Sequence, residues 1–155
     1  MMICFVLNGE RRTLEADPFD RASRILAEVC GLESVKTSCG IGRCGACTIL
    51  VDGEAVNACL LVAARMDGAD IVTADGLGAR ADALVAALRA EGAIQCGYCA
   101  PGLLVSLVAL QARGQALDRQ ELETVLAGNL CRCSGYAGLR RAVLGLAGRK
   151  WDRSA

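Results

Sequence analysis

Residues 39–47 read Cys-Gly-Ile-Gly-Arg-Cys-Gly-Ala-Cys, and the next cysteine along the chain is Cys59. The four cysteines, Cys39, Cys44, Cys47 and Cys59, follow the spacing C-x₄-C-x₂-C-x₁₁-C. A stretch this rich in glycine cannot form a regular helix or strand. Its glycines can take positive φ, so that successive backbone N–H groups turn toward the thiolates. The stretch therefore predicts a tight loop that presents N–H donors to sulfur, around which the N-terminal half folds.

The spacing of the first three cysteines, with a distant fourth, is typical of plant-type [2Fe–2S] sites. Such a group with four thiolates carries a formal charge of roughly −2, so it needs nearby donors, which the glycine loop can supply. The alternatives are a zinc loop or free structural thiols. Zinc quartets usually pair two C-x₂₋₄-C knuckles. Three ligands on one short loop favour the iron–sulfur group.

A second quartet combines a C-x₂-C pair, Cys96 and Cys99, with a C-x-C pair, Cys131 and Cys133. The first pair precedes Pro101, which suits the first turn of a helix. A helix N-terminus there would direct its dipole toward an anionic centre. A C-x-C pair is awkward for tetrahedral zinc but workable when the ligands fall on two irons. Zinc remains the main alternative, whereas a thioredoxin-type C-x-x-C would leave Cys131 and Cys133 unexplained.

The N-terminal half has the pattern of an α+β fold. Asn8-Gly9 and Asp52-Gly53 are strong hairpin-turn signals. A helix is expected from Arg21 to about Cys30, capped by Asp20 and ended by Gly31. Its apolar face would comprise Ile25, Leu26 and Val29. Short β-prone runs predict five strands, at Ile3–Leu7, Arg11–Glu15, Thr48–Val51, Ala55–Asn57 and Ile71–Thr73.

The C-terminal half has the pattern of helices. They are expected at Ala81–Ala90, from Pro101 to about Gln111, after a capping Asp118 with Glu121 three residues on, and at Leu139–Leu146. Asp75–Ala79 is rich in glycine and is expected to be a linker. The sequence therefore predicts two domains, at residues 1–75 and 80–155.

Composition excludes several classes of function. The 155-residue chain contains no histidine, which removes a Ser-His-Asp triad, a Cys₂His₂ zinc finger and a Rieske centre. Its formal net charge of zero argues against nucleic acid as a partner. No window approaches the roughly 18 apolar residues of a membrane span, and no basic leader precedes the first strand. We therefore expect a cytoplasmic protein, where clustered cysteines are more often metal ligands than disulfides. The remaining cysteines, Cys4 and Cys30, are expected to be small buried apolar residues.

Three motifs together resemble one family. They are C-x₂-G-x-C-G-x-C at 39–47, Gln-Cys-Gly-Tyr-Cys-x-Pro-Gly at 95–102, and Gly-Asn-x-Cys-Arg-Cys-x-Gly-Tyr at 128–136. With them the chain resembles the small iron–sulfur subunit of the xanthine oxidase family of molybdenum hydroxylases, from Ile3 to about Leu146. The resemblance implies a β-grasp, plant-ferredoxin-like N-terminal domain and a C-terminal four-helix bundle, each holding one [2Fe–2S] cluster. The chain departs from the usual pattern of the family at Leu88, Glu91 and Ser134, where Phe, His and Thr are common.

The resemblance also implies partners and a direction of electron flow. Electrons would pass from molybdopterin on a large subunit through the two clusters to FAD, on a medium subunit, or to another acceptor. Gln95 and Cys133 would lie against the pterin. No residue of this chain would convert substrate, since it offers no Rossmann fingerprint, P-loop or acid–base constellation. The alternative is a zinc-stabilised adaptor without a redox role.

Overall fold

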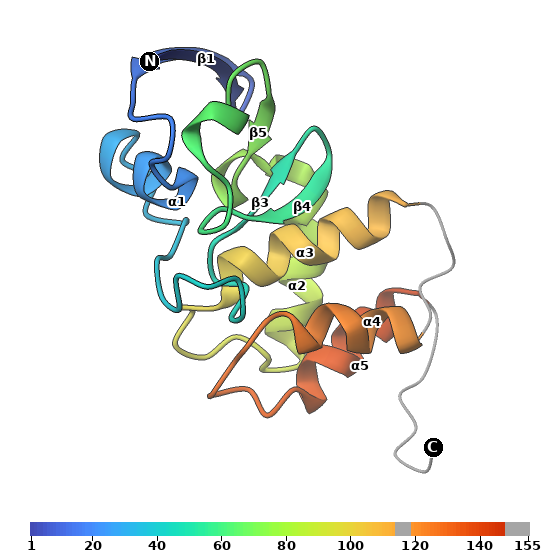
Figure 1. Cartoon of the computed structure of the whole chain (residues 1–155). Coiled ribbons are helices and arrows are strands. Elements are labelled where there is room, and N and C mark those ends of the chain that lie inside the picture. Colours follow the sequence, from blue (N-terminus) through green and yellow to red (C-terminus); the bar gives the residue numbers. More distant parts are fainter. Residues whose placement is uncertain (114–118, 148–155) are drawn as a thin grey trace.

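The structure is a computed structural model that describes residues 1–113 and 119–147 (Figure 1). A five-stranded mixed sheet occupies the N-terminal half, and helices occupy the C-terminal half. The α+β class predicted from the sequence is confirmed. The strands are β1 Met2–Leu7, β2 Glu10–Glu15, β3 Thr48–Val51, β4 Glu54–Asn57 and β5 Asp70–Val72.

The sheet order is β2-β1-β5-β3-β4, with β5 parallel to β1 and antiparallel to β3. Both hairpins have the predicted turns. Asn8 and Gly9 have φ of 52° and 86°, and Asp52 and Gly53 have φ of 51° and 86°. Positive φ at both central residues defines a type I′ turn, whose twist matches that of the strands it joins.

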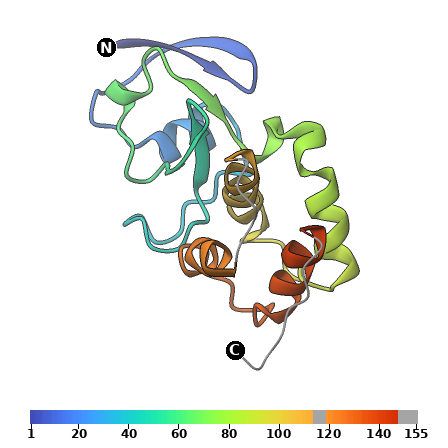
Figure 2. The same cartoon turned by 90° about the vertical axis from the view of Figure 1, so that its right-hand side faces the viewer.

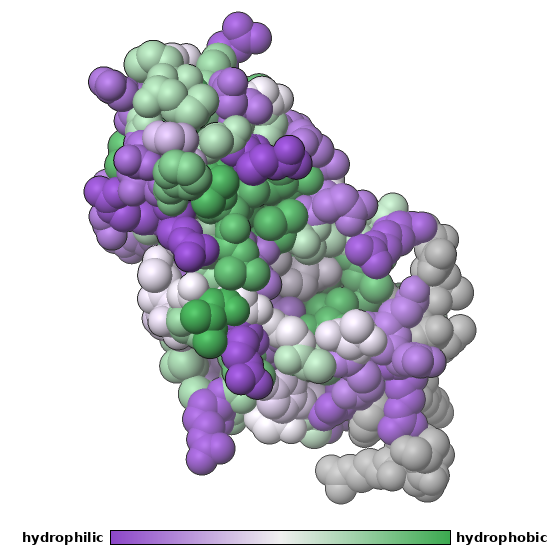
Figure 3. All heavy atoms as spheres, in the orientation of Figure 1, coloured by the Kyte–Doolittle hydropathy of each residue, from purple (hydrophilic) through white to green (hydrophobic). Residues whose placement is uncertain are grey.

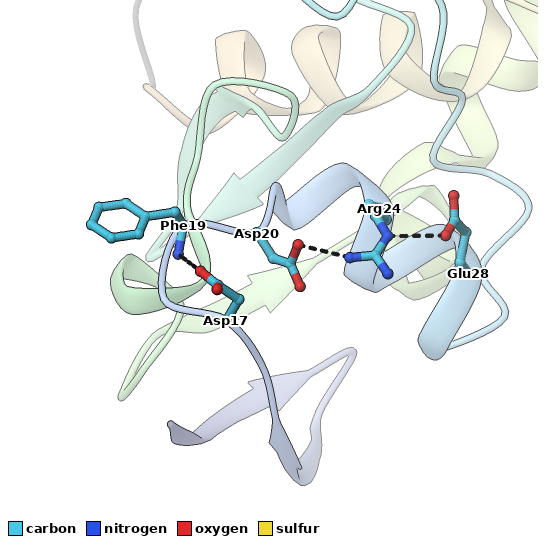
Figure 4. A network of polar contacts seen from close by, with 5 residues as sticks. All are labelled: Asp17, Phe19, Asp20, Arg24 and Glu28. Carbon is cyan, nitrogen blue, oxygen red and sulfur yellow. Dashed lines mark hydrogen bonds and ion pairs between the residues drawn. The ribbon is translucent and has the colours of Figure 1, made fainter.

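The helix predicted from Arg21 starts as α1, Ala22–Arg24, and continues as a π-helical turn, η1, Ile25–Val29. The predicted cap is wrong: Arg21 occupies the N-cap position without a side-chain bond. Asp20 instead accepts a hydrogen bond of 2.7 Å from the Arg24 guanidinium (Figure 4), because an i,i+4 cation competes for its carboxylate. The same Arg24 side chain also donates to Glu28 at 3.2 Å.

One residue of the predicted apolar face is also misplaced. Ile25 and Leu26 are buried in the core under the sheet, but Val29 is 61% exposed. Val29 lies at the end of the π-helical turn, where nothing from the sheet covers it. Gly31 follows with φ of 71°, as the predicted helix stop requires.

The C-terminal helices are α2 Asp82–Ala90, α3 Ala100–Ala112, α4 Arg119–Ala127 and α5 Ala137–Leu146. Asp118, the predicted cap of α4, lies outside the described residues. Figure 2 views α3 almost end-on, with the sheet on one side and α2 and α5 on the other. α3 is apolar on nearly all sides because it is the shared wall of both regions. No helix in the described part of the chain is long and apolar enough to cross a membrane.

The predicted linker is ordered structure. It forms two short 3₁₀ turns, Ala74–Gly76 and Gly78–Ala81, and Leu77 between them is buried in the helical core at 2% exposure. The glycine content predicted a linker; in the structure Leu77 packs in the helical core and Asp75 accepts a hydrogen bond from the Thr73 hydroxyl. The two regions are therefore joined by packed structure at this point.

The two regions also meet backbone to backbone at glycines. A Cβ on Gly102, near the start of α3, would overlap the Gly45 carbonyl oxygen. A Cβ on Gly45 would overlap the Gly128 carbonyl oxygen, just after α4. The cysteine loop is thus held between the beginning of α3 and the end of α4, and only hydrogen fits at these contacts.

We predict that Gly102→Ala lowers the free energy of unfolding by about 1–3 kcal/mol, because the new methyl group meets backbone that cannot rotate away. Gly145→Ala in α5 is the matched control, since its Cβ would meet nothing within 4 Å. That change should stabilise the protein by about 0.5–1 kcal/mol through helix propensity. Urea unfolding of both variants at equal iron content measures the difference. Equal stability of the two variants would contradict this packing.

Candidate metal centres

The glycine loop at 39–47 has the geometry that its sequence predicts. Gly40, Gly42 and Gly45 have φ of 67°, 74° and 71°. The Gly42 N–H donates to Cys59 Sγ at 3.2 Å, and the Arg43 N–H donates to Cys39 Sγ at 3.3 Å. Backbone donors therefore already face sulfur, as an anionic centre requires.

Within the first quartet, the Cys39 thiol lies within hydrogen-bonding reach of Cys44, and the Cys47 thiol lies within reach of Cys59 and close to Cys44. Hydrogen bonds from the N–H groups of Ile41, Arg43 and Cys44 lower the pKa of Cys39 from 9.0 to about 6. Burial raises the pKa of Cys47 to about 12. The loop thus combines an exposed side that favours thiolate and a buried side that favours the neutral thiol.

The second quartet brings each cysteine of the C-x₂-C pair against one of the C-x-C pair. Cys96 Sγ lies 3.6 Å from Cys133 Sγ, and Cys99 shares a side-chain hydrogen bond with Cys131. Burial raises the pKa of Cys99 to about 12. Burial also tends to raise the pKa of Cys131, but hydrogen bonds, chiefly from Ser134, outweigh burial and lower the pKa of that thiol. The Ser134 N–H donates to Cys131 Sγ at 3.3 Å.

Helix ends position the second quartet. Cys99 is the residue before α3, and Pro101 occupies the first turn of that helix as predicted. The C-x-C pair lies between α4 and α5, so that each cysteine of the C-x₂-C pair meets one of the C-x-C pair. A small cavity between these segments is lined by all four thiols and by Gln95. The N-terminal dipole of α3 points toward this gathering of sulfur.

The two quartets are linked through the backbone. The Leu130 N–H, next to Cys131, donates to the Cys44 carbonyl at 2.9 Å. Asn129 supports this contact from the buried side, because its side-chain amide donates to the Ser106 hydroxyl and to the Val125 carbonyl. A second, longer contact runs from the Tyr98 hydroxyl to the Thr37 carbonyl at 3.4 Å. The close backbone contacts at Gly45, Gly102 and Gly128 bring these segments together.

All eight predicted cysteines are therefore brought together in the two predicted groups, and their role as ligands stays a prediction. In residues 1–113 and 119–147, no three His, Cys, Asp or Glu side chains form a group that could hold a single metal ion. Within each quartet the four thiols instead lie in a chain of near contacts. A two-iron group with two thiolates on each iron fits that donor set.

Several supporting residues were missed by sequence reasoning. The Arg21 guanidinium donates to the Cys59 carbonyl at 2.6 Å, and the Asn57 amide donates to the Gly42 carbonyl at 3.1 Å. The Tyr136 hydroxyl accepts a hydrogen bond of 2.7 Å from the Cys131 N–H. Only Tyr136 belongs to a recognisable motif. The other two contacts join residues far apart in the chain and leave no local pattern.

The remaining residues singled out in the sequence lie at the surface or half-buried. Gln95, Arg43 and Arg132 are exposed, and their side chains have no hydrogen-bond or ion-pair partner in the part of the chain that the structure describes. Cys4 and Cys30 are half-buried, less enclosed than expected, and both lie outside the quartets. The three residues that depart from the family pattern all make contacts in the structure. Leu88 is fully buried, Glu91 forms an ion pair with Arg141 at 2.7 Å, and the Ser134 N–H donates to Cys131 Sγ.

A separate hollow of about 270 Å³ lies between α3, α4 and the β3–β4 hairpin, on the face drawn in Figure 3. Thr48, Asn57, Ser106 and Asn129 contribute polar groups to its wall, and Leu110 and Val125 contribute apolar ones. None of the cysteines lines it. This hollow is therefore distinct from the cavity between the thiols of the second quartet.

Comparison with known proteins agrees with this geometry. A 2Fe-2S iron-sulfur cluster binding domain matches residues 5–75, and a [2Fe-2S] binding domain matches residues 73–144. The xanthine dehydrogenase iron-sulfur-binding subunit of Escherichia coli O157:H7 is 43% identical over 142 residues, covering 89% of this chain and 89% of that protein. The nicotinate dehydrogenase small FeS subunit of Eubacterium barkeri is 37% identical over 139 residues, covering 88% of this chain and 88% of that protein.

A solved structure extends the likeness to three dimensions. Quinoline 2-oxidoreductase from Pseudomonas putida 86 superposes with a TM-score of 0.87 at 38% identity, over 95% of this chain and 92% of the matched chain. Fold, cysteine loops and these matches define an iron–sulfur protein of the oxidoreductase class. Within that class, the chain belongs to the iron–sulfur subunits of the xanthine oxidase family of molybdenum hydroxylases.

The pKa differences predict an order of alkylation in the metal-free chain. Cys39 should react with iodoacetamide at half its maximal rate near pH 6, because its thiolate is lost only as the pH falls through its pKa of about 6. Cys47 and Cys99, with pKa values of about 12, should stay unreactive up to pH 9. Peptide mass spectrometry after timed labelling measures each rate, with urea-unfolded chain as the control. Faster labelling of Cys47 than of Cys39 would contradict the geometry of the loop.

Proposed function

We propose that this chain relays electrons within a molybdenum hydroxylase through two [2Fe–2S] clusters. Cys39, Cys44, Cys47 and Cys59 would hold the first, and Cys96, Cys99, Cys131 and Cys133 the second. The observation that carries the proposal is the gathering of four thiols in each quartet with backbone N–H groups directed at sulfur, since an anionic four-thiolate cluster needs such donors. A zinc adaptor would use the same thiols, so metal content decides between the two.

A bound [2Fe–2S] cluster would accept and return one electron at a time. The protein's own task is to hold an anionic group whose negative charge grows on reduction. N–H donors at Gly42, Arg43 and Ser134 point at sulfur and would stabilise that charge. The apolar surroundings of Cys47 and Cys99 would limit access of water to the other side of each cluster.

The contact between the quartets supports a relay. One hydrogen bond, from the Leu130 N–H to the Cys44 carbonyl, joins the backbones of the two cysteine segments. Cys44 would be a ligand of the first cluster, and Leu130 precedes Cys131, which would be a ligand of the second. We assign the quartets to two domains, residues 1–75 and 80–155, the second a four-helix bundle formed by α2 to α5. Both domains would work as one body because α3 packs against β3 and β4 of the sheet as well as against α4.

Exposure supports the choice of partners. Cys96, Cys133 and Gln95 are exposed together, so a large molybdopterin-binding subunit could bring the pterin against Cys133 and Gln95. Arg43 is exposed on the glycine loop, where a medium FAD-binding subunit or another acceptor could approach the first cluster. Substrate conversion would take place on the large subunit, and no residue of this chain would be catalytic. We place the complex in the cytoplasm, where clustered thiols stay reduced.

The first test is metal content and its assignment. Anaerobically purified protein should contain about four iron and four acid-labile sulfide per chain. Cys47→Ser should remove one set of EPR signals of the reduced protein, and Cys99→Ser the other. Serine at Cys30, outside both quartets, is the control and should remove neither. Stoichiometric zinc with little iron, or loss of both signals from one folded variant, would refute the assignment.

The second test is the direction of electron flow in the assembled complex. Gln95→Ala should slow reduction of the clusters by substrate, because the pterin loses a hydrogen-bonding neighbour, while both clusters stay assembled. Arg43→Glu should instead slow delivery to the acceptor, since it places a negative charge beside the first cluster. Gln111→Ala and Arg65→Glu are matched controls, because both residues are exposed and neither adjoins a quartet cysteine in the sequence. Stopped-flow absorbance separates the two steps. If the effects of the two variants were exchanged, the proposed order would be reversed.

A further inference from the structure

Tyr136 has a backbone conformation that a bulky residue rarely adopts. Its φ is 63° and its ψ is −17°, in the left-handed region, directly after Gly135 at φ of 62°. Steric contact between side chain and backbone disfavours this region for every residue except glycine. A large aromatic side chain held there requires surroundings that compensate for the strain.

The compensation comes from contacts to the C-x-C loop. The Tyr136 hydroxyl accepts a hydrogen bond of 2.7 Å from the Cys131 N–H and donates one of 3.3 Å to the Asn129 carbonyl. Its backbone N–H donates to the Ser134 hydroxyl at 3.2 Å. The left-handed turn therefore directs the ring back along the chain. The one hydroxyl then binds the backbone of Asn129 and of Cys131, the two neighbours of Leu130, whose own N–H donates to Cys44.

A second layer holds the ring itself. The Arg140 guanidinium lies 5.7 Å from the centre of the Tyr136 ring. It is clamped by two hydrogen bonds to Glu123 of α4, at 2.6 and 2.7 Å. A bidentate pair of this kind fixes orientation as well as charge. The contacts run from α4 through α5 to the C-x-C loop, and none of them involves a cysteine sulfur.

The N–H groups around Cys131 are directed differently. Those of Cys133 and Ser134 are directed at Cys131 Sγ, whereas the N–H of Cys131 itself donates to the Tyr136 hydroxyl. N–H donors that face cluster sulfurs raise the reduction potential, because they stabilise the more negative reduced state. Tyr136 therefore holds one N–H of this loop, that of Cys131, away from sulfur.

We propose that Tyr136 is a positioning residue that sets the reduction potential of the helical-domain cluster, by withholding the Cys131 N–H from the sulfurs. This inference rests on the proposed two-cluster function. Tyr136 need not touch cluster, pterin or substrate. It acts through the orientation of one amide and through the shape of the loop between α4 and α5.

The test is redox titration of the assembled complex, followed by EPR, with Tyr136→Phe. Removing the hydroxyl frees the Cys131 N–H beside anionic sulfur, so the potential of the helical-domain cluster should rise. At a fixed potential we expect at least a threefold change in its ratio of oxidised to reduced form, about 30 mV for a one-electron couple. Its EPR g values should change as well. The signal removed by Cys47→Ser, from the other cluster, should stay in place.

Tyr98→Phe is the matched control. It deletes a tyrosine hydroxyl from the other loop of this quartet, where that hydroxyl donates a long hydrogen bond of 3.4 Å to the Thr37 carbonyl and none to a cysteine. It should leave the potential unchanged. Glu123→Gln weakens the hold on Arg140 from outside the loop, so it should shift the same signal in the same direction by less. This variant tests the inference even if Tyr136→Phe does not assemble.

The possible outcomes distinguish failure of the proposed two-cluster function from failure of the proposed role of Tyr136. Zinc in place of iron in the parent protein would overturn the proposed function and this inference together. Full iron content with an unchanged or lowered potential in Tyr136→Phe would overturn only the role of Tyr136. Equal shifts of both clusters would also overturn that role, because they would indicate general loosening of the protein.

Discussion

The structure depends on the close approach of three glycine backbones, at Gly45, Gly102 and Gly128. Any side chain on Gly45 or Gly102 would overlap a carbonyl oxygen of the opposing segment. Because only hydrogen lies between them, the start of α3 and the end of α4 reach the cysteine loop of the sheet region directly. The hydrogen bond from Leu130 to Cys44, and with it the proximity of the two quartets, follows from this contact.

Each quartet has one side that favours charge and one that resists it. At Cys39 and Cys131, hydrogen bonds from neighbouring groups lower the thiol pKa. At Cys47 and Cys99, burial raises the pKa to about 12. Metal binding requires thiolates, so occupation of either site must release protons chiefly from the buried cysteines. The opposed environments suit a group that must be both stabilised as an anion and shielded from water.

The departures from the family pattern fall where the structure can absorb them. Leu88 packs in a core that is built almost wholly from Ala, Leu and Val, so a smaller residue there is matched by its neighbours. Glu91 lies beside Arg141 and forms an ion pair across α2 and α5. Ser134 keeps the hydroxyl that its usual counterpart would offer, and that hydroxyl accepts the N–H of Tyr136. None of the three is a cysteine of either quartet.

The sequence by itself determined the local structure and the grouping of the cysteines. Turn type at Asn8-Gly9 and Asp52-Gly53, the strand bounds to within a residue, and the start of α3 at Pro101 depend on neighbours along the chain, so pattern and propensity were sufficient. Tertiary structure decided the rest. Asp20 binds Arg24 instead of capping a helix, Val29 faces outward, and the glycine-rich connection at Leu77 is packed. The pairing of Cys96 with Cys133 and the reach of Tyr136 to Cys131 also appear only in three dimensions. Such contacts depend on how helices far apart in the sequence pack together, and no local spacing encodes that packing.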